Sequence, residues 1–505
     1  MKSLSPTLLF IGASACLLNL SGLVKPLQAA EQWEPLQVQS VPDFSENTVT
    51  TATLQNKTDT IDAFVEEIIR ERQIPGLSLA VVYDEKLIKT SSYGLLDRER
   101  GIKARPSSVF PIASMSKPLT ATAVMLLVEA GKLDLDAPIS TYLLDLPDAW
   151  QPITLRQVLA HTAGLSERVY SQKISKLTTA EGFLAEAIQE PLDFQPNEAW
   201  MYSNTGYNLA AIIVESVSGE SFDAFAKARI FEPLGMTNTD VLRDSYVSSN
   251  QAVGYQPTNR GRSVEAIDVD YRALPKIMPM FLGAGSVTSN AVDMAKWAIA
   301  LQKGQLLTPA SQAEMQQFST MNSGLVTNYG LGWFLDTVNG HDVISHGGNL
   351  WGYSSSIVRF PEDKLSVIVL MNKDNESGDL IANKIAEQYI PDLAFDRDAP
   401  AVADLDPDLT QKILSFINGD ENAIDRTPEA LLALQTPRGQ SILDRYRQYR
   451  REYTVESLTL IESQTHPNGT RRRYRATATA GEPHIITAVV TPDSLLSNMT
   501  ISISQ

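Results

Sequence analysis

Cysteine is almost absent from this sequence of 505 residues, and the single example is Cys16. It lies in an N-terminal segment that we expect to be removed on export, so the mature chain would have no disulfide, no cysteine nucleophile and no thiolate metal site. Histidine is also scarce, with five residues spread along the chain. They show no spacing typical of metal ligands, and we therefore expect neither a metal nor another cofactor.

Basic residues are outnumbered, since 42 Lys and Arg face 59 Asp and Glu and the formal net charge is −17 at pH 7. Such an acidic chain repels phosphate backbones, so nucleic acid is not an expected partner.

Long apolar runs are missing as well. The N-terminal run Leu8–Val24 is interrupted by Ser, Gly and Asn, and it is too short for a transmembrane anchor.

The N-terminus has the features of an export signal. Lys2 precedes the apolar run, and Lys25-Pro26 and the small pair Ala29-Ala30 follow it. We therefore predict a signal peptide over residues 1–30 and a mature protein that is periplasmic or secreted. A lipid attached to Cys16 is the alternative, and it would tie the chain to a membrane.

Hydrophobic periodicity predicts a large domain, residues 59–395, with strands at both ends and helices between them. The polar residues 31–58 before it show no periodicity and are expected to be a linker. An apolar helix face at 61–69 opens the domain, and a helix at about 379–389 closes it. The expected strands are 77–83, 87–93, 343–345, 355–360 and 365–370. Strands from such distant segments predict one antiparallel sheet with an inserted helical subdomain.

A stretch rich in Pro, Asp and Ala at 391–405 predicts a linker to a second, small α+β domain at 403–505. Its expected helices are 409–417, 428–434 and 442–450, and its expected strands are 454–461, 470–479, 484–490 and 499–504. The basic run Arg471-Arg472-Arg473 lies on one strand, where we expect it to form a solvated face. No nucleophile is paired with a base here. We therefore expect an accessory role: covering the sheet, mediating assembly or bordering the cleft, and dispensable for chemistry on small substrates.

The stretch around Ser114 carries the first chemical signal. Apolar residues at helical spacing follow Ser114, which places it at the head of a predicted helix, in the cap position. Lys117 lies one turn further on, on the same face. A hydroxyl beside an ammonium, at the positive end of a helix dipole, is the arrangement of an activated serine nucleophile.

Two further elements follow in chain order. Tyr202-Ser203-Asn204 precedes a helix that we expect to begin near Tyr207, and His346-Gly347-Gly348 ends a predicted strand. Together with S-x-x-K they resemble the three motifs of the serine β-lactamase and penicillin-binding protein family. The sequence around His161, L-A-H-T-A-G-L, is similar to the branch of class C β-lactamases, DD-peptidases and esterases. The resemblance covers about residues 60–390 and implies the α+β fold of that family, with an antiparallel sheet flanked by helices.

The resemblance also implies roles for the motif residues. Ser114 would form an acyl-enzyme, while Lys117 and Tyr202 would share the general-base and general-acid work. Asn204 would orient Lys117 and bind the amide of the substrate. The backbone N–H groups of Ser114 and Asn349 would hold the oxyanion.

His346 and Gly348 complete the predicted substrate-binding set, because the glycines let an acyl group lie against the strand edge. His346 stands where true β-lactamases usually have lysine, which favours an esterase or a peptidase acting on small esters, amides or D-amino-acid peptides. A β-lactamase, or a catalytically silent module that binds peptides or peptidoglycan, is the alternative. His161 is expected to make structural hydrogen bonds, and the apolar run at 277–282 to line either the cleft or the core. The oligomeric state stays open.

Overall fold

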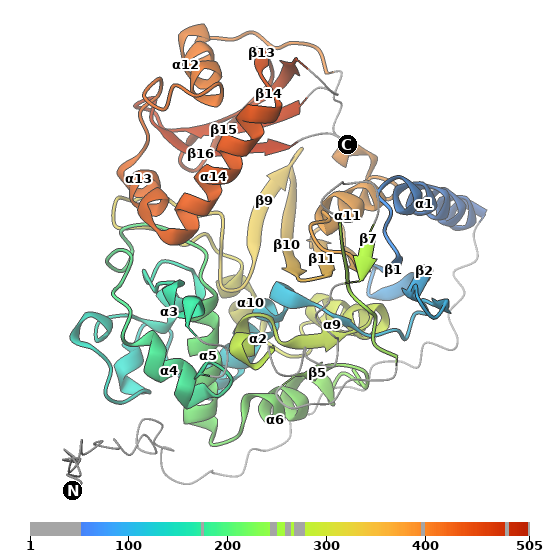
Figure 1. Cartoon of the computed structure of the whole chain (residues 1–505). Helices are drawn as coiled ribbons and strands as arrows, with labels where there is room; N and C mark the ends of the chain where they lie inside the picture. The colour runs from blue at the N-terminus through green and yellow to red at the C-terminus, as the bar shows by residue number, and fades with distance from the viewer. Residues whose placement is uncertain are drawn as a thin grey trace, which may run out of the picture.

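The computed structural model describes residues 52–172, 176–242, 250–257, 264–266, 278–394, 399–479 and 484–502. Their helices and strands form a large part, up to residue 394, and a C-terminal part, from residue 399, which lies at the top in Figure 1. The predicted signal peptide, Cys16 and most of the predicted linker at 31–58 fall outside the described residues. None of the helices in the described ranges combines the length and the apolar character needed to cross a bilayer.

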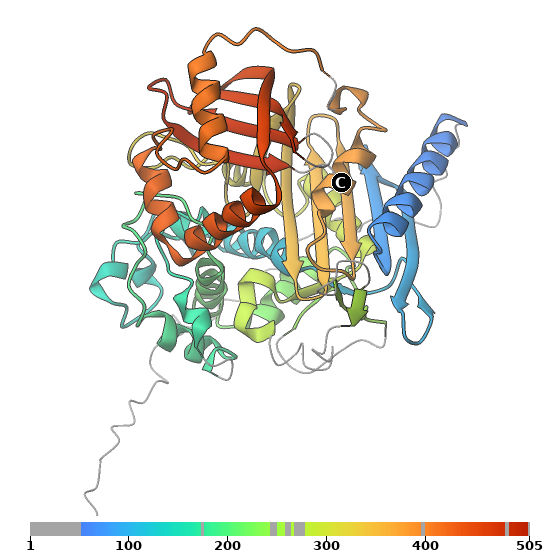
Figure 2. The ribbon, with the colours of Figure 1, turned by 45° about the horizontal axis from the view of Figure 1, so that its top comes forward.

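A seven-stranded antiparallel sheet supports the large part (Figure 2), with the strand order β3-β2-β1-β12-β11-β10-β9. Strands β1 and β12 pair at its centre, from Leu77 with Met371 to Tyr83 with Leu365. This confirms the predicted antiparallel sheet built from distant segments. The strands are β1 Gly76–Tyr83, β2 Lys86–Asp97, β3 Ile102–Lys103, β9 Phe334–Val338, β10 His341–Leu350, β11 Tyr353–Phe360 and β12 Leu365–Met371.

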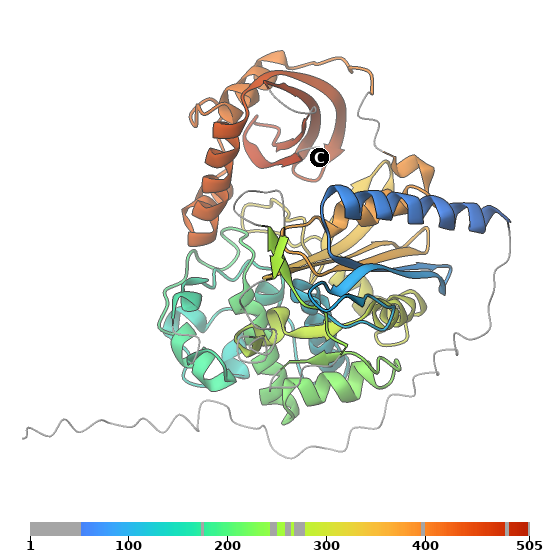
Figure 3. The same cartoon turned by 45° about the vertical axis from the view of Figure 1, so that its right-hand side comes forward.

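Helices cover both faces of this sheet, so its central strands are buried on both sides and read as continuous apolar runs. Helices α1 (Ala52–Glu71) and α11 (Gly378–Ala386) pack on one face, and Figure 3 shows α1 lying across the strands. Helix α9 (Ala291–Lys303) packs on the opposite face with the helical middle of the chain. Helix α1 begins inside the stretch that we predicted as a linker, because its polar first turns give no apolar periodicity.

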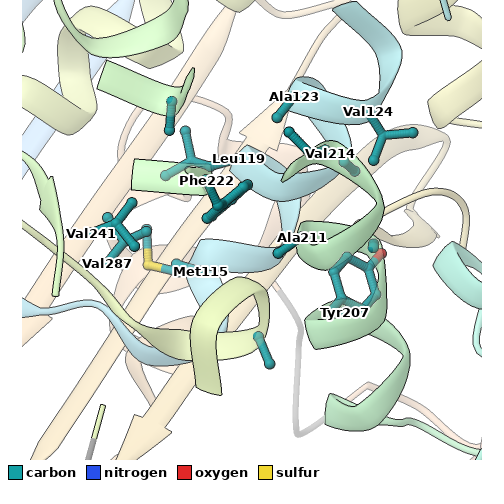
Figure 4. Close-up of a cluster of buried hydrophobic side chains, with 14 of the residues drawn as sticks. Met115, Leu119, Ala123, Val124, Tyr207, Ala211, Val214, Phe222, Val241 and Val287 are labelled. Atoms are coloured by element: carbon teal, nitrogen blue, oxygen red, sulfur yellow. The ribbon is translucent and has the colours of Figure 1, made fainter. Parts of the chain in front are cut away.

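Helix α2 (Ser116–Glu129) is the central helix of the large part, and residues Ser116–Leu127 are all buried. A helix buried all round has no polar face, which explains the small and apolar side chains on every side. Figure 4 shows its side chains in one cluster with those of α5 (Asn204–Ser218) and α6 (Phe222–Ala226). This packing fixes the beginning of α2, where the nucleophile candidate lies.

The other elements of the large part are short. They are β4 Phe110–Pro111, η2 Ala113–Met115, η3 Ile139–Thr141, η4 Asp148–Trp150, α3 Leu155–Leu159, η5 Arg168–Ser171, α4 Ala180–Ala187, η7 Lys227–Phe231, β5 Asp240–Val241, β6 Tyr255–Pro257, β7 Val264–Ala266, η9 Met278–Phe281, α8 Leu282–Gly285, β8 Val287–Ser289, α10 Pro309–Met315 and η10 Pro391–Leu393. Most of them lie between β2 and β9, in the region where we predicted the inserted helical subdomain.

The C-terminal part has its own core, in which Ile413, Tyr474 and Ile486 are fully buried. Three helices cover a four-stranded antiparallel sheet of order β13-β14-β15-β16. The elements follow the predicted order: α12 Pro407–Ile417, α13 Pro428–Gln435, α14 Pro437–Glu452, β13 Val455–His466, β14 Gly469–Ala478, β15 His484–Val490 and β16 Leu496–Ser502.

The prediction that Arg471-Arg472-Arg473 form a solvated face is wrong. Arg471 and Arg472 are buried, and Arg472 pairs with Asp404. Arg471 reaches across to the large part, where it donates to Asp336 Oδ1 at 2.7 Å and to Thr337 O at 2.9 Å. These partners come from outside the hairpin, so an alternation rule within one strand does not reveal them.

Candidate active site

Ser114 lies in the turn between β4 and α2, and not at the cap position of α2 that we predicted. It belongs to the short helix η2, and Met115 is the residue that precedes α2. Ala113 has φ +48°, a left-handed conformation that is uncommon for a residue with a Cβ. This turn places Ser114 on the wall of a cleft of about 420 Å³. Because η2 leads directly into α2, Lys117 still lies next to Ser114.

Lys117 is fully buried, and its Nζ contacts three oxygens. Nζ lies 3.1 Å from Ser114 Oγ, 2.8 Å from Asn204 Oδ1 and 2.8 Å from Ala284 O. Burial lowers the pKa of Lys117 well below its usual value. A neutral amine has two N–H groups, which suit the two carbonyl oxygens, and its lone pair then faces Ser114 Oγ. In that state Lys117 can accept the proton of Ser114.

Tyr202 completes the group around Ser114. The centroid of its ring is 4.6 Å from Lys117 Nζ, and its hydroxyl is hydrogen-bonded with Ser114. Burial raises the pKa of Tyr202, and the hydrogen bond with Ser114 opposes that rise. The phenol is therefore protonated at neutral pH and can donate a proton to a leaving group.

Glu167 holds the amide of Asn204, the first residue of α5. Asn204 Nδ2 donates to Glu167 Oε2 at 3.0 Å, which turns Asn204 Oδ1 toward Lys117. The other oxygen, Oε1, accepts from Ser203 Oγ, Thr205 N and Thr205 Oγ, at 3.1, 2.9 and 3.1 Å. A carboxylate at this helix start is also favoured by the helix dipole. We did not identify Glu167 as a site residue from the sequence, although it lies just after the L-A-H-T-A-G-L stretch. We also predicted that α5 begins near residue 207, whereas the helix begins at Asn204.

Strand β10 brings a second wall to Ser114. The H-G-G motif lies inside β10 and does not end the strand as we predicted. Pairing with β9 stops at Ser345, and among the described strands none pairs with this edge of β10 beyond it. Gly348 permits close approach, because a Cβ there would lie 2.3 Å from Ile112 O in the turn before Ser114. Asn349 lines the same cleft as Ser114 and Asn204.

His346 is buried beside Tyr202, with the ring centroids 6.2 Å apart. Its Nδ1 lies 2.7 Å from Gly347 O and must donate to that carbonyl, so Nε2 accepts from the hydroxyl of Tyr329 at 2.9 Å. Burial lowers the pKa of His346 to about 3, so the ring is neutral at physiological pH. His346 therefore adds no positive charge to the site. No motif in the sequence pointed to Tyr329 as the partner of His346.

His161 makes the structural hydrogen bond that we predicted, because its Nδ1 accepts from Ser203 N at 3.0 Å. The apolar run at 277–282 serves both expected purposes. Met278 and Met280 are buried in the core, whereas Phe281 lines the cleft. Residue 277 lies outside the described residues.

The cleft has an apolar wall and a polar wall. Phe281, Leu350 and Trp351 form the apolar one, with the rings of Phe281 and Trp351 6.2 Å apart. Asp374 and Asn375 supply the polar side. The structure thus brings Ser114, Asn204 and Asn349 into one cleft, with Lys117, Tyr202 and His346 packed behind them.

Comparison with known sequences gives a family match over the large part. A family model described as Beta-lactamase matches residues 61–390. Penicillin-binding protein 4* of Bacillus subtilis (strain 168) is 30% identical over 351 residues, which are 64% of this chain and 73% of that protein. Protein flp of Staphylococcus aureus (strain COL) is 26% identical over 328 residues, and the match covers 63% of each chain. The chain thus spans less than two thirds of the length of protein flp.

Solved structures have the same fold. The D-amino acid amidase from Ochrobactrum anthropi SV3, complexed with L-phenylalanine amide, is 25% identical with a TM-score of 0.56, over 68% of this chain and 99% of that chain. The octameric penicillin-binding protein homologue from Pyrococcus abyssi covers 89% of this chain and 96% of its own, with a TM-score of 0.58. At 21% identity this second likeness shows the fold alone.

Proposed function

The chain belongs to the Beta-lactamase family and is a serine hydrolase of that family, and from this premise we propose that it cleaves small amides or esters through a Ser114 acyl-enzyme. The observation that carries the proposal is the contact of the buried Lys117 amine with Ser114 Oγ, Asn204 Oδ1 and Ala284 O. Two acceptors for two N–H groups leave a lone pair for the hydroxyl proton.

In the proposed reaction, Ser114 Oγ attacks the carbonyl carbon while its proton passes to the neutral Lys117. The backbone N–H groups of Ser114 and Asn349 stabilise the oxyanion. Tyr202 donates a proton to the leaving amine or alcohol as that bond breaks, and Lys117 restores the proton of Tyr202. Water then attacks the acyl-enzyme with the same groups acting in reverse, which releases the acid and returns Ser114.

The cleft supports an acyl group that is apolar or aromatic, because Phe281, Leu350 and Trp351 line one wall. The likeness to a D-amino acid amidase supports amides of D-amino acids among the substrates. The neutral ring of His346 supports esterase or amidase activity over β-lactamase activity, since it offers no charge to the carboxylate of a β-lactam.

A covalent-labelling experiment tests the proposal. The purified chain and its Ser114→Ala variant are incubated with a fluorophosphonate probe, and the modified residue is located by mass spectrometry. We expect an adduct on Ser114 in the unaltered chain and none in the variant. An unmodified chain that still binds peptide or peptidoglycan fragments would instead support the binding module.

A substrate panel tests the preference. It contains p-nitrophenyl esters, D-phenylalanine amide, a D-alanyl peptide and nitrocefin. We expect turnover of an ester or an amide with a kcat/KM above that for nitrocefin. Nitrocefin as the best substrate would overturn the preference and leave a β-lactamase.

We also propose that the chain is exported after removal of residues 1–30. Cell fractionation with N-terminal sequencing of the mature chain tests this, and Glu31 is the expected first residue. Metabolic labelling of Cys16 by a fatty-acid analogue would show the lipoprotein alternative instead.

A further inference from the structure

The C-terminal part reaches the active site through Arg438, the second residue of α14. The guanidinium of Arg438 lies 4.5 Å from the centroid of the Tyr202 ring, and its Nη1 is 3.9 Å from Glu167 Oε2. From these contacts we propose that Arg438 is a positioning residue of the active site, which acts on Ser114 through Tyr202 and through the hydrogen-bond network of Glu167. This inference rests on the proposed function of Ser114.

The beginning of α14 is held firmly in place. Thr436 Oγ accepts from Gly439 N at 3.0 Å and lies 2.8 Å from Ala433 O. Gly439 lets α13 and α14 approach closely, because a Cβ there would lie 2.1 Å from Ala433 O. Arg438 therefore extends from a rigid corner, and little conformational freedom of the backbone is lost when its side chain contacts Tyr202.

The helix itself disfavours a cation at this position. A positive charge in the first turn faces the positive end of the helix dipole, and the first turn of α14 has no acidic residue to offset it. By contrast, Arg450 and Arg451 occupy the last turn, where the dipole favours them. A side chain that breaks the local rule needs a compensating tertiary contact, and Glu167 and the face of Tyr202 supply it.

The two parts of the chain also meet along the segment that leads to Tyr202. Leu432 and Ala433 of α13 pack against a cluster of Phe194, Ala199 and Met201. In Figures 1 and 3, α13 and α14 reach from the C-terminal sheet down toward the large part. The distance between Arg438 and Tyr202 is therefore set by packing on both sides of the contact.

A second attachment is made by Asn468, which lies between β13 and β14. Asn468 receives a hydrogen bond from Val326 N at 2.7 Å and donates one to Val326 O at 2.7 Å. Together with Arg471 on Asp336, it attaches the C-terminal part to the large part independently of Arg438. Replacement of Arg438 should therefore leave the two parts together.

The charge of Arg438 acts on the proton-transfer groups. It lowers the pKa of Lys117 and of Tyr202, in addition to the larger effects of burial, whereas the charge of Glu167 raises both. The other titratable groups around Tyr202 are His161, Tyr329, Tyr207, Tyr170 and His346. Burial lowers the pKa of both histidines and raises the pKa of these tyrosines, so they are neutral near pH 7. Arg438 thus favours the neutral Lys117 that accepts the proton of Ser114.

This inference departs from our expectation that the C-terminal domain is dispensable for chemistry on small substrates. A cation that contacts Tyr202 belongs to the site even when the substrate is too small to touch the C-terminal part. Of the three accessory roles that we considered, bordering the cleft is the one that this contact favours.

The experiment uses the full chain and the variants Arg438→Met and Arg438→Lys, with Arg445→Met as the matched control. Arg445 is an exposed arginine on the same helix. The rate of Ser114 modification by the fluorophosphonate probe and kcat/KM for p-nitrophenyl acetate are measured from pH 5 to pH 10. In Arg438→Met, the acidic limb of both profiles should move to higher pH by about half a unit to one unit. Rates should fall about three- to tenfold on that limb and recover on the alkaline plateau.

In Arg438→Lys, the acidic limb should return most of the way to its pH in the unaltered chain. Arg445→Met should have the same profiles as the unaltered chain. A limb that stays in place in Arg438→Met, or a loss equal at every pH, would overturn the inference. If Arg438→Met does not fold, Arg438→Gln takes its place. No adduct on Ser114 in the unaltered chain overturns the proposed function as well, whereas normal labelling with an unmoved limb overturns only the role of Arg438.

Discussion

Replacement of Glu167 by Gln is the sharpest test of the hydrogen bonds that orient Asn204 toward Lys117. It keeps the shape of the side chain but removes one hydrogen-bond acceptor and the negative charge. Four donors converge on the two oxygens of Glu167, from Ser203, Asn204 and Thr205. If the new NH2 group replaces Oε2, it faces Asn204 Nδ2 and the guanidinium of Arg438. If it replaces Oε1, it faces the backbone N–H of Thr205, which, unlike a hydroxyl, cannot rotate to present an acceptor. In either orientation one donor meets another donor.

The expected loss of stability follows from these four bonds. A hydrogen bond to a charged group contributes about 1.5–3 kcal/mol and a neutral one about 0.5–1.5 kcal/mol. Each of the three bonds that survive loses roughly 1 kcal/mol, and one unpaired donor costs about 1–3 kcal/mol, so the free energy of unfolding should fall by about 4–6 kcal/mol. Asn204 is then free to turn its amide, so we expect kcat for an ester to fall about 10–100-fold.

The pH profile gives a second, independent reading. The charge of Glu167 raises the pKa of Lys117, so its removal should move the acidic limb of kcat/KM to lower pH. This direction is opposite to that expected for Arg438→Met. A pair of variants with shifts of opposite sign separates an electrostatic effect from general damage to the fold.

Denaturant unfolding and steady-state kinetics on the ester are the measurements for Glu167→Gln. Glu186→Gln is the matched control, since Glu186 is partly exposed and pairs with the exposed Lys176 at 2.8 Å, and the change should alter the free energy of unfolding by less than about 1 kcal/mol. The reasoning is refuted if Glu167→Gln unfolds like the unaltered chain with an unchanged kcat, or if the acidic limb moves to higher pH.

Three further predictions concern the motif residues themselves. Ser114→Ala should abolish acylation, and Lys117→Ala and Tyr202→Phe should each lower kcat by several orders of magnitude without adding in the double variant; modest and additive losses in steady-state kinetics would contradict the shared role. Gly348→Ala would place a methyl group 2.3 Å from a backbone oxygen of the Ser114 turn, and it should lower the free energy of unfolding by about 1–3 kcal/mol and ester turnover with it; unchanged denaturation and turnover would contradict this. His346 takes up a proton only near pH 3 in the fold but near pH 6.5 when unfolded, so stability should fall as the pH drops below 6.5; the slope of the free energy of unfolding against pH should be flatter in His346→Gln, and equal slopes would count against a neutral buried ring.

Local patterns were sufficient for much of the fold. The β1 and β12 strands are short, largely apolar runs bounded by turn residues, and their positions and that of β11 followed from the sequence pattern within a residue or two. The proximity of Ser114 and Lys117 could also be predicted from their spacing, because one helical turn brings together residues three positions apart, whether the turn is α or 3-10. The point at which α2 begins did not follow, because packing around Ala113 decides it.

Partners distant in the sequence set the limit of such reasoning. Glu167 was an unremarkable acidic residue until α5 brought Ser203, Asn204 and Thr205 against it. Arg471 looked like the solvated side of a hairpin until its partner Asp336 came from another sheet.

The sequence by itself determined which residues are the candidates for the chemistry, because S-x-x-K, Y-S-N and H-G-G depend on residue type and on order along the chain. Only the tertiary structure decided what surrounds them. The pKa of Lys117 and the neutrality of His346 both depend on burial, and the place of Arg438 depends on the docking of a C-terminal part outside the family match. Burial and charge act through space, and distance in space is the quantity that a linear pattern does not contain.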